Sequence, residues 1–313
     1  RIRLIHPQDL LVSTLDKKLT DITEGAAMDA SGEKSLGAAP ACEPQQDVPA
    51  LEARNLMLVW GNDQVVAEDI SIELQPGTIT CLVGRSGCGK TTLLHALAGL
   101  LQPQEGTVLL HGSDVTGHPG HIGYMLQKDL LIPSKRIIDN VALPLELKGV
   151  SRAEARARAQ EMLERGGLER VSQSWPHELS GGMRQRVAFL RTALIGSDIM
   201  LLDEPFSALD ALTRREMRAW LMSSVKEFGL SVLVITHDVD EAVAMASRIY
   251  VMAGSPAQGV VTKIVGVVEP QGCADTVSEA GSGKGAGQGA DLASFDLSEE
   301  FLAAKREVLS LLG

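Results

Sequence analysis

The chain has 313 residues and a net charge of −11 at pH 7, which argues against a general nucleic-acid binder, because such proteins usually carry a basic stripe. Its hydrophobic fraction of 44% is enough for a large buried core, and no apolar run approaches the roughly 18 residues that span a bilayer. Pro7, Gln8 and Asp9 interrupt the start of the sequence, so no signal peptide is predicted there.

Residues 1–48 form a first region that is acidic and separate from the core. Leu11, Leu15 and Leu19 recur at helical spacing, which predicts one short helix before Ile22. Residues 24–49 are rich in Gly, Ala, Ser and Pro, a composition typical of a linker. We therefore expect an N-terminal extension over 1–48, partly helical and then irregular.

The region 49–268 is close to electrically neutral and is punctuated like an α/β domain. Apolar and polar residues alternate in two segments, 51–60 and 69–74, which predicts antiparallel strands. Runs that are nearly all apolar predict strands buried on both faces. The expected buried strands are 78–83, 199–202 and 231–236, with further strands at 248–252 and 259–267. The expected helices are 91–100, 151–165, 183–195 and 241–246.

The chain ends in a linker over 269–297 and an amphipathic helix over 298–313. The run 281–289 is glycine-rich and superficially resembles a phosphate loop, but no strand precedes it and no apolar helix follows it, so a flexible linker is the better interpretation. The final helix offers five apolar side chains for packing, namely Phe301, Leu302, Val308, Leu309 and Leu312.

The four cysteines give no sign of a metal site or a disulfide framework. Cys42, Cys81, Cys88 and Cys273 form no C-x-x-C pair and no zinc-type cluster with histidine. This usage fits a reducing compartment.

The strongest motif is a glycine-rich loop between the strand at 78–83 and the following helix. It reads Gly84-Arg85-Ser86-Gly87-Cys88-Gly89-Lys90-Thr91, followed by Thr92, and matches G-x-x-x-x-G-K-[ST] in full. Glycines let successive backbone amides curl around a phosphate, and the helix start adds a positive dipole end. Lys90 is expected to reach the β- and γ-phosphates, and the Thr91 hydroxyl to bind Mg²⁺.

Acidic and imidazole side chains follow two other buried strands, at the edge where open α/β sheets bind ligands. Asp203 and Glu204 come directly after 199–202. Asp203 is expected to hold Mg²⁺, and Glu204 to accept a proton from the attacking water. His237 follows 231–236 and is placed to touch the γ-phosphate and that water. An acidic pair at a strand end, or a single histidine there, is by itself often an ordinary turn.

The run Leu179-Ser180-Gly181-Gly182-Met183-Arg184-Gln185-Arg186 is decisive in combination with these motifs. It resembles the signature of ATP-binding-cassette (ABC) ATPases. Other family motifs then match: Gln127 resembles the Q-loop glutamine, 207–210 the D-loop, and His237 the switch histidine. Trp60 occupies the place of the aromatic that stacks on adenine, although a strand-end aromatic can also be structural.

The resemblance covers roughly 50–268 and implies a P-loop NTPase fold. This fold combines a RecA-like α/β core, an antiparallel β-subdomain and an inserted helical subdomain that carries the signature. It implies ATP and Mg²⁺ as cofactors, with Lys90, Gln127, Glu204 and His237 as catalytic residues. The implied metal ligands are Thr91, Gln127 and Asp203. The family works as head-to-tail pairs, which implies a homodimer or pairing with a partner ATPase. Ser180, Gly181 and Gly182 of one copy are then expected to close on the ATP of the other.

A finer resemblance is to the ATPase subunits of importers for nitrate, sulfonates, taurine and related solutes. It rests on 130–133, 139–145, 206–214 and 237–242, and departs from the subfamily at Ser134, where tryptophan is usual. It implies ATP hydrolysis coupled to transport through a separate permease docked near 128–150. A solute-binding protein is an indirect partner, and the location is peripheral, at the cytoplasmic face of the inner membrane.

Two alternatives remain open on the sequence. One is a soluble ABC ATPase that acts on nucleic acid or ribosomes, although such proteins usually carry two cassettes or a long coiled-coil insertion. The other is a non-transport regulatory ABC module, against which the intact Lys90, Asp203, Glu204 and His237 count.

Overall fold

The computed structural model describes residues 48–61, 64–270 and 298–313. The predicted helix within 1–22, the glycine-rich run 281–289, Cys42 and Cys273 lie outside these residues. In the described part, the strands are β1 Leu51–Trp60, β2 Gln64–Leu74, β3 Ile79–Gly84, β4 Glu105–Leu110, β5 Ser113–Asp114, β6 Gly123–Met125, β7 Ile199–Asp203, β8 Ser231–Thr236, β9 Arg248–Ser255 and β10 Val260–Val268. The helices are α2 Lys90–Leu97, α3 Ile137–Leu147, α4 Arg152–Arg165, α5 Gly181–Ala193, α6 Ala211–Phe228, α7 Val239–Met245 and α9 Glu299–Leu312.

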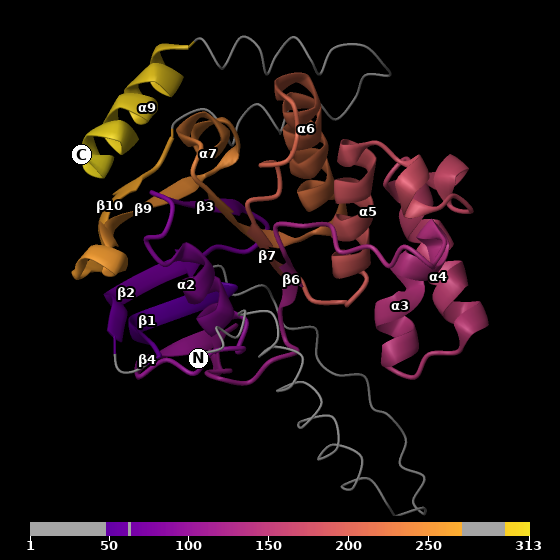
Figure 1. Ribbon diagram of the computed structural model, residues 1–313, viewed down its shortest axis with the longest axis horizontal. Coiled ribbons are helices and arrows are strands. Elements are labelled where there is room, and N and C mark those ends of the chain that lie inside the picture. The colour runs from indigo at the N-terminus through magenta and orange to yellow at the C-terminus, as the bar shows by residue number, and fades with distance from the viewer. Residues whose placement is uncertain (1–47, 62–63, 271–297) are drawn as a thin grey trace, which may run out of the picture. The chain divides into compact units, whose positions relative to one another are not determined.

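All ten described strands form one sheet, in the order β5-β4-β1-β2-β10-β9-β3-β8-β7-β6. The run from β9 to β6 is parallel, whereas β1, β2, β4 and β5 pair antiparallel. The two parts meet where Thr262 of β10 pairs with Ala67 of β2. The antiparallel strands predicted at 51–60 and 69–74 are confirmed, with β2 longer than expected (Figure 1).

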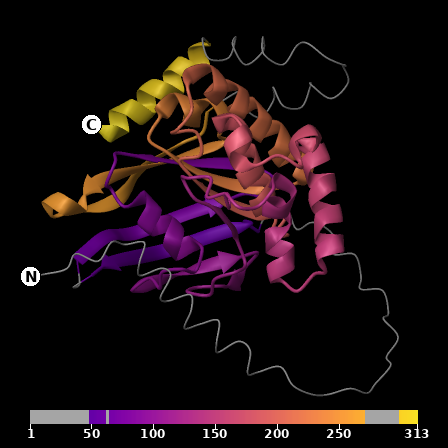
Figure 2. The same ribbon diagram turned by 45° about the vertical axis from the view of Figure 1, so that its right-hand side comes forward.

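The parallel strands are buried on both faces because their apolar residues alternate between two cores. In β8, Val232 and Val234 enter one core while Leu233 and Ile235 enter the other. The first core contains residues of α3, α4, α5, α6, α7 and α9, and the second contains α2 and the antiparallel strands. Figure 2 shows these two layers on opposite sides of the parallel strands. The predicted α/β fold of the P-loop NTPase type is therefore what the chain adopts.

Helices α3, α4 and α5 pack against one another beside the sheet and correspond to the predicted inserted helical segment (Figure 1). Asn140 in α3 is fully buried and holds the preceding loop, because its side chain accepts a hydrogen bond from the Ile132 amide and donates to the Ile132, Lys135 and Arg136 carbonyls. Phe189 of α5 meets Trp220 of α6 edge to face, with ring centroids 5.2 Å apart. These contacts fasten the signature helix to the core.

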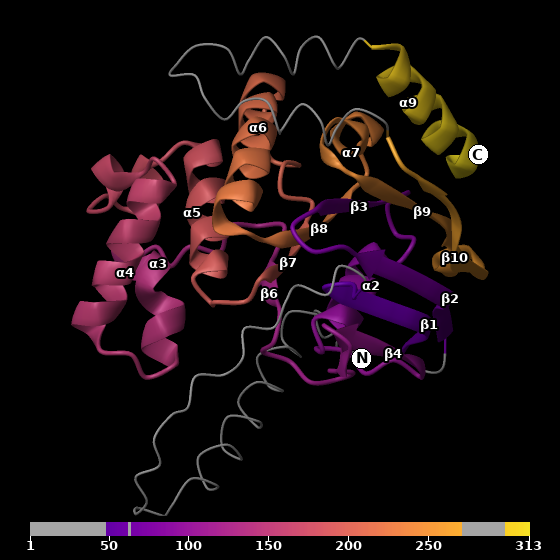
Figure 3. The ribbon, with the colours of Figure 1, turned by 180° about the vertical axis from the view of Figure 1, so that it is seen from behind.

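The C-terminal helix α9 packs against α7, β9 and β10 (Figure 3). Phe301, Ala304 and Val308 are buried, and Leu312 packs partly buried against the same core. The packing predicted for Leu302 and Leu309 is wrong, since they are 41% and 48% exposed. The helical turn explains this, because residues 301, 304 and 308 share one face and residues 302 and 309 lie off it.

The helices of the described residues are all too short or too polar to cross a membrane.

Candidate functional site

The phosphate-loop motif connects β3 to α2 with a backbone that only glycine accommodates easily at two positions. Gly89 has φ +102°, and a Cβ there would meet the Val66 side chain at 2.7 Å. At Gly84 a Cβ would lie 2.8 Å from both the Cys88 sulfur and the Met252 carbonyl oxygen. These close approaches leave no room for side chains, so the loop keeps an open cradle of backbone amides.

Lys90 lies inside this loop and is only 6% exposed. Its Nζ donates to the carbonyl oxygens of Gly84 at 2.8 Å and Arg85 at 2.9 Å. The ammonium therefore lies at the start of α2, together with the helix dipole. This is the arrangement that binds an anionic phosphate chain. Burial raises the pKa of the neighbouring Cys88 thiol, which fits a packed structural cysteine.

Thr91 and Asp203 come together although they are 112 residues apart. The Thr91 hydroxyl donates to Asp203 Oδ2 at 3.1 Å. Burial raises the pKa of Asp203, the Thr91 hydrogen bond opposes that shift, and the Glu204 carboxylate adds to it. The pKa of the Tyr124 hydroxyl is raised by burial and by the nearby Asp203 charge. The pair thus offers the hydroxyl of the exposed Thr91 beside the buried carboxylate of Asp203.

The donor set at Thr91 and Asp203 fits Mg²⁺, which prefers oxygen ligands and usually takes one or two carboxylates together with substrate phosphates. No group of three or more His, Cys, Asp or Glu side chains that could enclose a metal exists within residues 48–61, 64–270 and 298–313.

Glu204 has a backbone of the left-handed type, with φ +45°, and its amide donates to the Ile235 carbonyl at 2.9 Å. A non-glycine residue rarely adopts this conformation, which turns the side chain out of the direction of β7. The carboxylate accepts from Gln127 Nε2 at 3.2 Å and lies 3.2 Å from His237 Nδ1. Glu204 therefore contacts two other residues that were predicted as catalytic, Gln127 and His237.

A small cavity of about 30 Å³ adjoins these groups, lined by Glu204, Ser207, Arg214, Thr236, His237, Asp238 and Glu241. A water molecule needs roughly 10–15 Å³ of such space and two or more polar partners. The cavity therefore has room for a water beside the Glu204 carboxylate and the His237 imidazole.

The Gln127 amide also lies 3.3 Å from the Ser207 hydroxyl, and Gln185 donates to the Gln127 carbonyl at 3.3 Å. These contacts bring Gln127 to Glu204 and Ser207 rather than to Thr91 and Asp203. Gln127 thus lies beside Glu204, and its catalytic role and its role as a metal ligand both stay predictions.

The signature residues begin α5. Ser180 is the N-cap, and its hydroxyl accepts a hydrogen bond from the Met183 amide at 3.3 Å. A Cβ at Gly182 would meet the Thr213 methyl at 2.8 Å, and one at Gly181 would meet Leu209 at 3.3 Å. The glycines thus let the start of α5 approach the start of α6 closely.

The remaining predicted nucleotide-binding residues are accessible. Trp60 is 51% exposed at the end of β1, so its ring is available for stacking. Arg85, Ser86 and Gly87 are exposed, and Thr92 is half-buried. The Arg85 guanidinium donates to the Gly313 carbonyl at 2.7 Å, a contact between the phosphate loop and the end of α9 that the sequence did not suggest.

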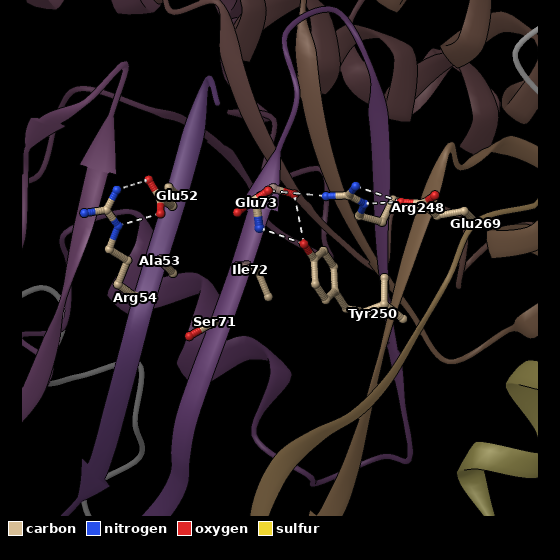
Figure 4. A pocket seen from close by; sticks show the side chains of 10 residues that line it. Glu52, Ala53, Arg54, Ser71, Ile72, Glu73, Arg248, Tyr250 and Glu269 are labelled. Atoms are coloured by element: carbon tan, nitrogen blue, oxygen red, sulfur yellow. Dashed lines mark hydrogen bonds and ion pairs between the residues drawn. The ribbon is translucent and has the colours of Figure 1, made fainter. Parts of the chain in front are cut away.

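A larger groove of about 420 Å³ lies elsewhere, between β1, β2, β9 and β10 (Figure 4). Arg54 pairs with Glu52, and Arg248 pairs with Glu73 and Glu269. Arg248 begins β9 and pairs with Thr80 at the start of β3, so the groove lies toward the end of these strands opposite to the phosphate loop. Its charged side chains bind one another, and it has no part in the nucleotide site.

Sequence reasoning missed three residues that the structure ties to this site, namely Arg214, Thr236 and Glu241. Arg214 contacts Asp238 and Glu241, and Thr236 donates to Glu241 at 2.6 Å. The signal available was the position of Thr236 and Glu241 on either side of His237. Nothing in the sequence pairs them with an arginine in another helix.

Comparison with known proteins gives the same assignment. A family model described as ABC transporter matches residues 67–207. The taurine import ATP-binding protein TauB of Pseudomonas aeruginosa (strain UCBPP-PA14) is 42% identical over 198 residues, which cover 63% of this chain and 75% of that protein. The chain belongs to the family of ABC transporter ATP-binding proteins. It is therefore an ABC ATPase, and ATP is its nucleotide.

Other ABC proteins extend this comparison. The nitrate import ATP-binding protein NrtC of Synechococcus elongatus is 39% identical over 202 residues, covering 64% of this chain and 31% of that protein. A dimeric ATP-binding cassette solved in a post-hydrolysis state with ADP and phosphate is 31% identical, with a TM-score of 0.56, covering 64% of this chain and 93% of that one. CbiO1 of Clostridium perfringens, with a TM-score of 0.62 at 24% identity and coverage of 68% and 91%, supports the fold alone.

Proposed function

We propose that this ABC ATPase is the energising subunit of an importer that takes up a small solute, of the nitrate, sulfonate or taurine type, through a separate membrane permease. The matched relatives named for taurine and nitrate import support this choice. Relatives of similar identity are named for spermidine and putrescine import and for Fe³⁺ import. Solute identity is therefore expected to reside in the partner subunits.

One observation carries the proposed chemistry: the Glu204 carboxylate is held between Gln127 and His237, next to a cavity large enough for water. In this proposal Glu204 accepts the proton of the attacking water, and His237 holds that water and the γ-phosphate. Gln127 contacts the same carboxylate, and a change in this contact on ATP hydrolysis is transmitted toward the permease. Phosphoryl transfer depends mainly on such positioning and charge neutralisation.

Thr91 and Asp203 would hold Mg²⁺, which neutralises charge on the β- and γ-phosphates when it is bound. Gln127 was predicted as a third ligand. Lys90 and the amides of 84–91 bind the phosphate chain, and the exposed ring of Trp60 stacks on the adenine.

Two copies are proposed to work head to tail, with Ser180, Gly181 and Gly182 of one copy closing on the ATP of the other. The start of α5 supplies amides and a positive helix end for that contact. The permease is proposed to dock near 128–150, where Leu130 is 53% and Leu147 is 80% exposed. The proposed location is therefore peripheral, at the cytoplasmic face of the inner membrane, and the proposed indirect partner is a solute-binding protein.

The division of the chain into an extension over 1–48, an ATPase domain over 49–268, a linker over 269–297 and a terminal helix over 298–313 is part of the same proposal. The strands from β1 to β10, which span 51–268, support the limits of the central domain.

ATP hydrolysis by two variants tests the chemistry. Lys90→Ala is expected to abolish ATP retention, because it removes the ammonium from the phosphate loop. Glu204→Gln is expected to retain ATP and dimerise but to lower kcat by about 10²–10⁴-fold, the usual contribution of a general base. Lys148→Ala serves as the control for a lost lysine, since Lys148 binds the Ile195 carbonyl in the helical segment. Unchanged turnover in Glu204→Gln would remove Glu204 from the role of base.

The transport role needs a separate test. An affinity-tagged chain expressed in its native cells is expected to co-purify with a small hydrophobic membrane protein. Recovery of RNA, DNA or ribosomes instead would favour the soluble alternative.

A further inference from the structure

We propose that Arg214 is a positioning residue that couples the D-loop, 207–210, to the switch histidine His237. The inference rests on the proposed function, in which His237 acts beside Glu204. It adds a residue that contacts neither the phosphate loop nor Glu204 in the structure but holds the segments that carry the chemistry.

Arg214 stands at the start of α6, one turn after the N-cap Asp210. Its guanidinium reaches two segments at once: one NH₂ group donates to the Leu209 carbonyl in the D-loop at 3.1 Å, and the other donates to Asp238 Oδ2 at 3.2 Å. Its Nε lies 3.4 Å from Glu241 Oε1. A planar guanidinium presents donors in several fixed directions, which a lysine ammonium cannot reproduce.

Both neighbours of His237 in the chain are held by the partners of Arg214. Thr236 donates its hydroxyl to Glu241 Oε2 at 2.6 Å, and the same hydroxyl accepts from the Asp238 amide at 3.0 Å. Asp238 is the N-cap of α7, and its Oδ1 accepts from the amides of Asp240 and Glu241. The backbone around His237 is thus fixed by a hydrogen-bonded network in which Arg214 is the cation that contacts both Asp238 and Glu241.

The network connects the D-loop to His237, so a displacement of either segment is expected to displace the other. The Arg214 side chain is 32% exposed and the Glu241 side chain only 6% exposed. The arginine therefore connects the D-loop at the surface to a buried carboxylate. The D-loop also supplies Ser207, whose hydroxyl contacts Gln127 and the Glu204 carbonyl. Leu209 of the D-loop also adjoins Gly181, which is proposed to meet the second copy's ATP. A shift of the D-loop on dimer closure would therefore move the Leu209 carbonyl, Arg214 and the His237 backbone together.

The test measures ATP hydrolysis and ATP affinity of the full chain carrying Arg214→Gln and Arg214→Lys. Both are expected to lower kcat, Gln by about tenfold or more, because two charge-assisted hydrogen bonds are lost, and Lys less. The ATP dissociation constant is expected to stay within about twofold, since Arg214 does not contact the phosphate loop. Arg165→Ala is the matched control, because Arg165 pairs with Glu227 at the far end of α6.

A double-variant comparison separates coupling from a general loss of structure. If Arg214 acts through His237, then Arg214→Gln added to His237→Ala lowers kcat by less than about twofold beyond His237→Ala alone. Full multiplication of the two effects, or wild-type kcat in Arg214→Gln, would overturn the proposal. If Arg214→Gln fails to fold, Arg214→Lys alone and with His237→Ala decides by the same criterion.

The wild-type chain distinguishes the two levels of failure. Absence of ATP hydrolysis in the wild type, with no effect of Lys90→Ala, refutes the proposed function itself. Hydrolysis that depends on Lys90 but is indifferent to Arg214 refutes only the coupling.

Discussion

The buried hydrogen bond between Thr236 and Glu241 gives a quantitative prediction about stability. Thr236→Val keeps the side-chain shape and removes a hydroxyl that donates to Glu241 Oε2 at 2.6 Å and accepts from the Asp238 amide at 3.0 Å. Thr236 is 2% and Glu241 5% exposed, so water does not replace the lost donor. Leaving a buried charged acceptor short of one hydrogen bond costs about 2–4 kcal/mol.

Thr262→Val is a matched control within the same fold. Thr262 is fully buried, and its hydroxyl donates to the neutral Cys88 carbonyl, also at 2.6 Å. Because that acceptor carries no charge, we expect a smaller loss of about 1–2 kcal/mol. Urea unfolding at pH 7 with unchanged m-values is the assay, and each kcal/mol should appear as about 2–4 °C in Tm.

The cost of Thr236→Val should also depend on pH. Burial raises the pKa of Glu241 above its ordinary 4.5, and the Thr236 hydrogen bond works in the opposite direction. Since the folded pKa lies above the unfolded one, ionisation of Glu241 lowers stability as the pH rises from 4.5 through the folded pKa. Removing the hydroxyl raises the folded pKa further, so the loss should be smallest below pH 4.5 and grow above it. A pH-independent loss no larger than that of Thr262→Val would refute the reasoning.

Two further substitutions test packing and loop geometry. Phe301→Ala removes a buried side chain of α9 and should lower the free energy of unfolding in urea by about 3–5 kcal/mol. If α9 detaches before the core unfolds, hydrogen exchange should show the amides of α9 exposed. Leu302 is 41% exposed, so Leu302→Ala should change the free energy of unfolding by less than about 1 kcal/mol. Gly89→Ala should abolish ATP retention in a filter-binding assay, because the new Cβ collides with Val66. Gly77→Ala has a comparable positive φ but open space around it, and equal damage from both would contradict this explanation.

The parts of the fold that were predicted from sequence are those that local patterns determine. Apolar runs at 199–202 and 231–236 had to be strands buried on both faces, and they are β7 and β8. The loop 84–91 was predictable because phosphate binding requires its glycines and its lysine at a fixed spacing within one short segment.

The elements that were missed lack such a pattern. The longest described helix, α6 at Ala211–Phe228, is rich in charged residues, and only four of its side chains are buried. Its boundary signals were present, since Asp210 caps its start and Gly229 ends it in the left-handed conformation. Helix α3 contains Pro144, which argues against a helix unless the surrounding packing compensates. The partners of Arg214 could not be predicted, because they depend on how α6 and α7 meet in space.

The strand order explains why the site assembles around Glu204. Strands β3, β8, β7 and β6 are parallel neighbours in that order, so their carboxyl ends meet at one edge. Glu204 follows β7, the strand between β8 and β6, and it therefore contacts His237 from the one side and Gln127 from the other.

The phosphate loop reaches the same edge from β3, one strand beyond β8. Its helix α2 must project Thr91 past β8 to meet Asp203 at the end of β7, and the 3.1 Å hydrogen bond shows that it does. A side chain that follows β8 thus lies between the phosphate loop and the Glu204 carboxylate. His237 occupies that place, and its position is fixed by Thr236 and Asp238, which Glu241 and Arg214 hold from the other side.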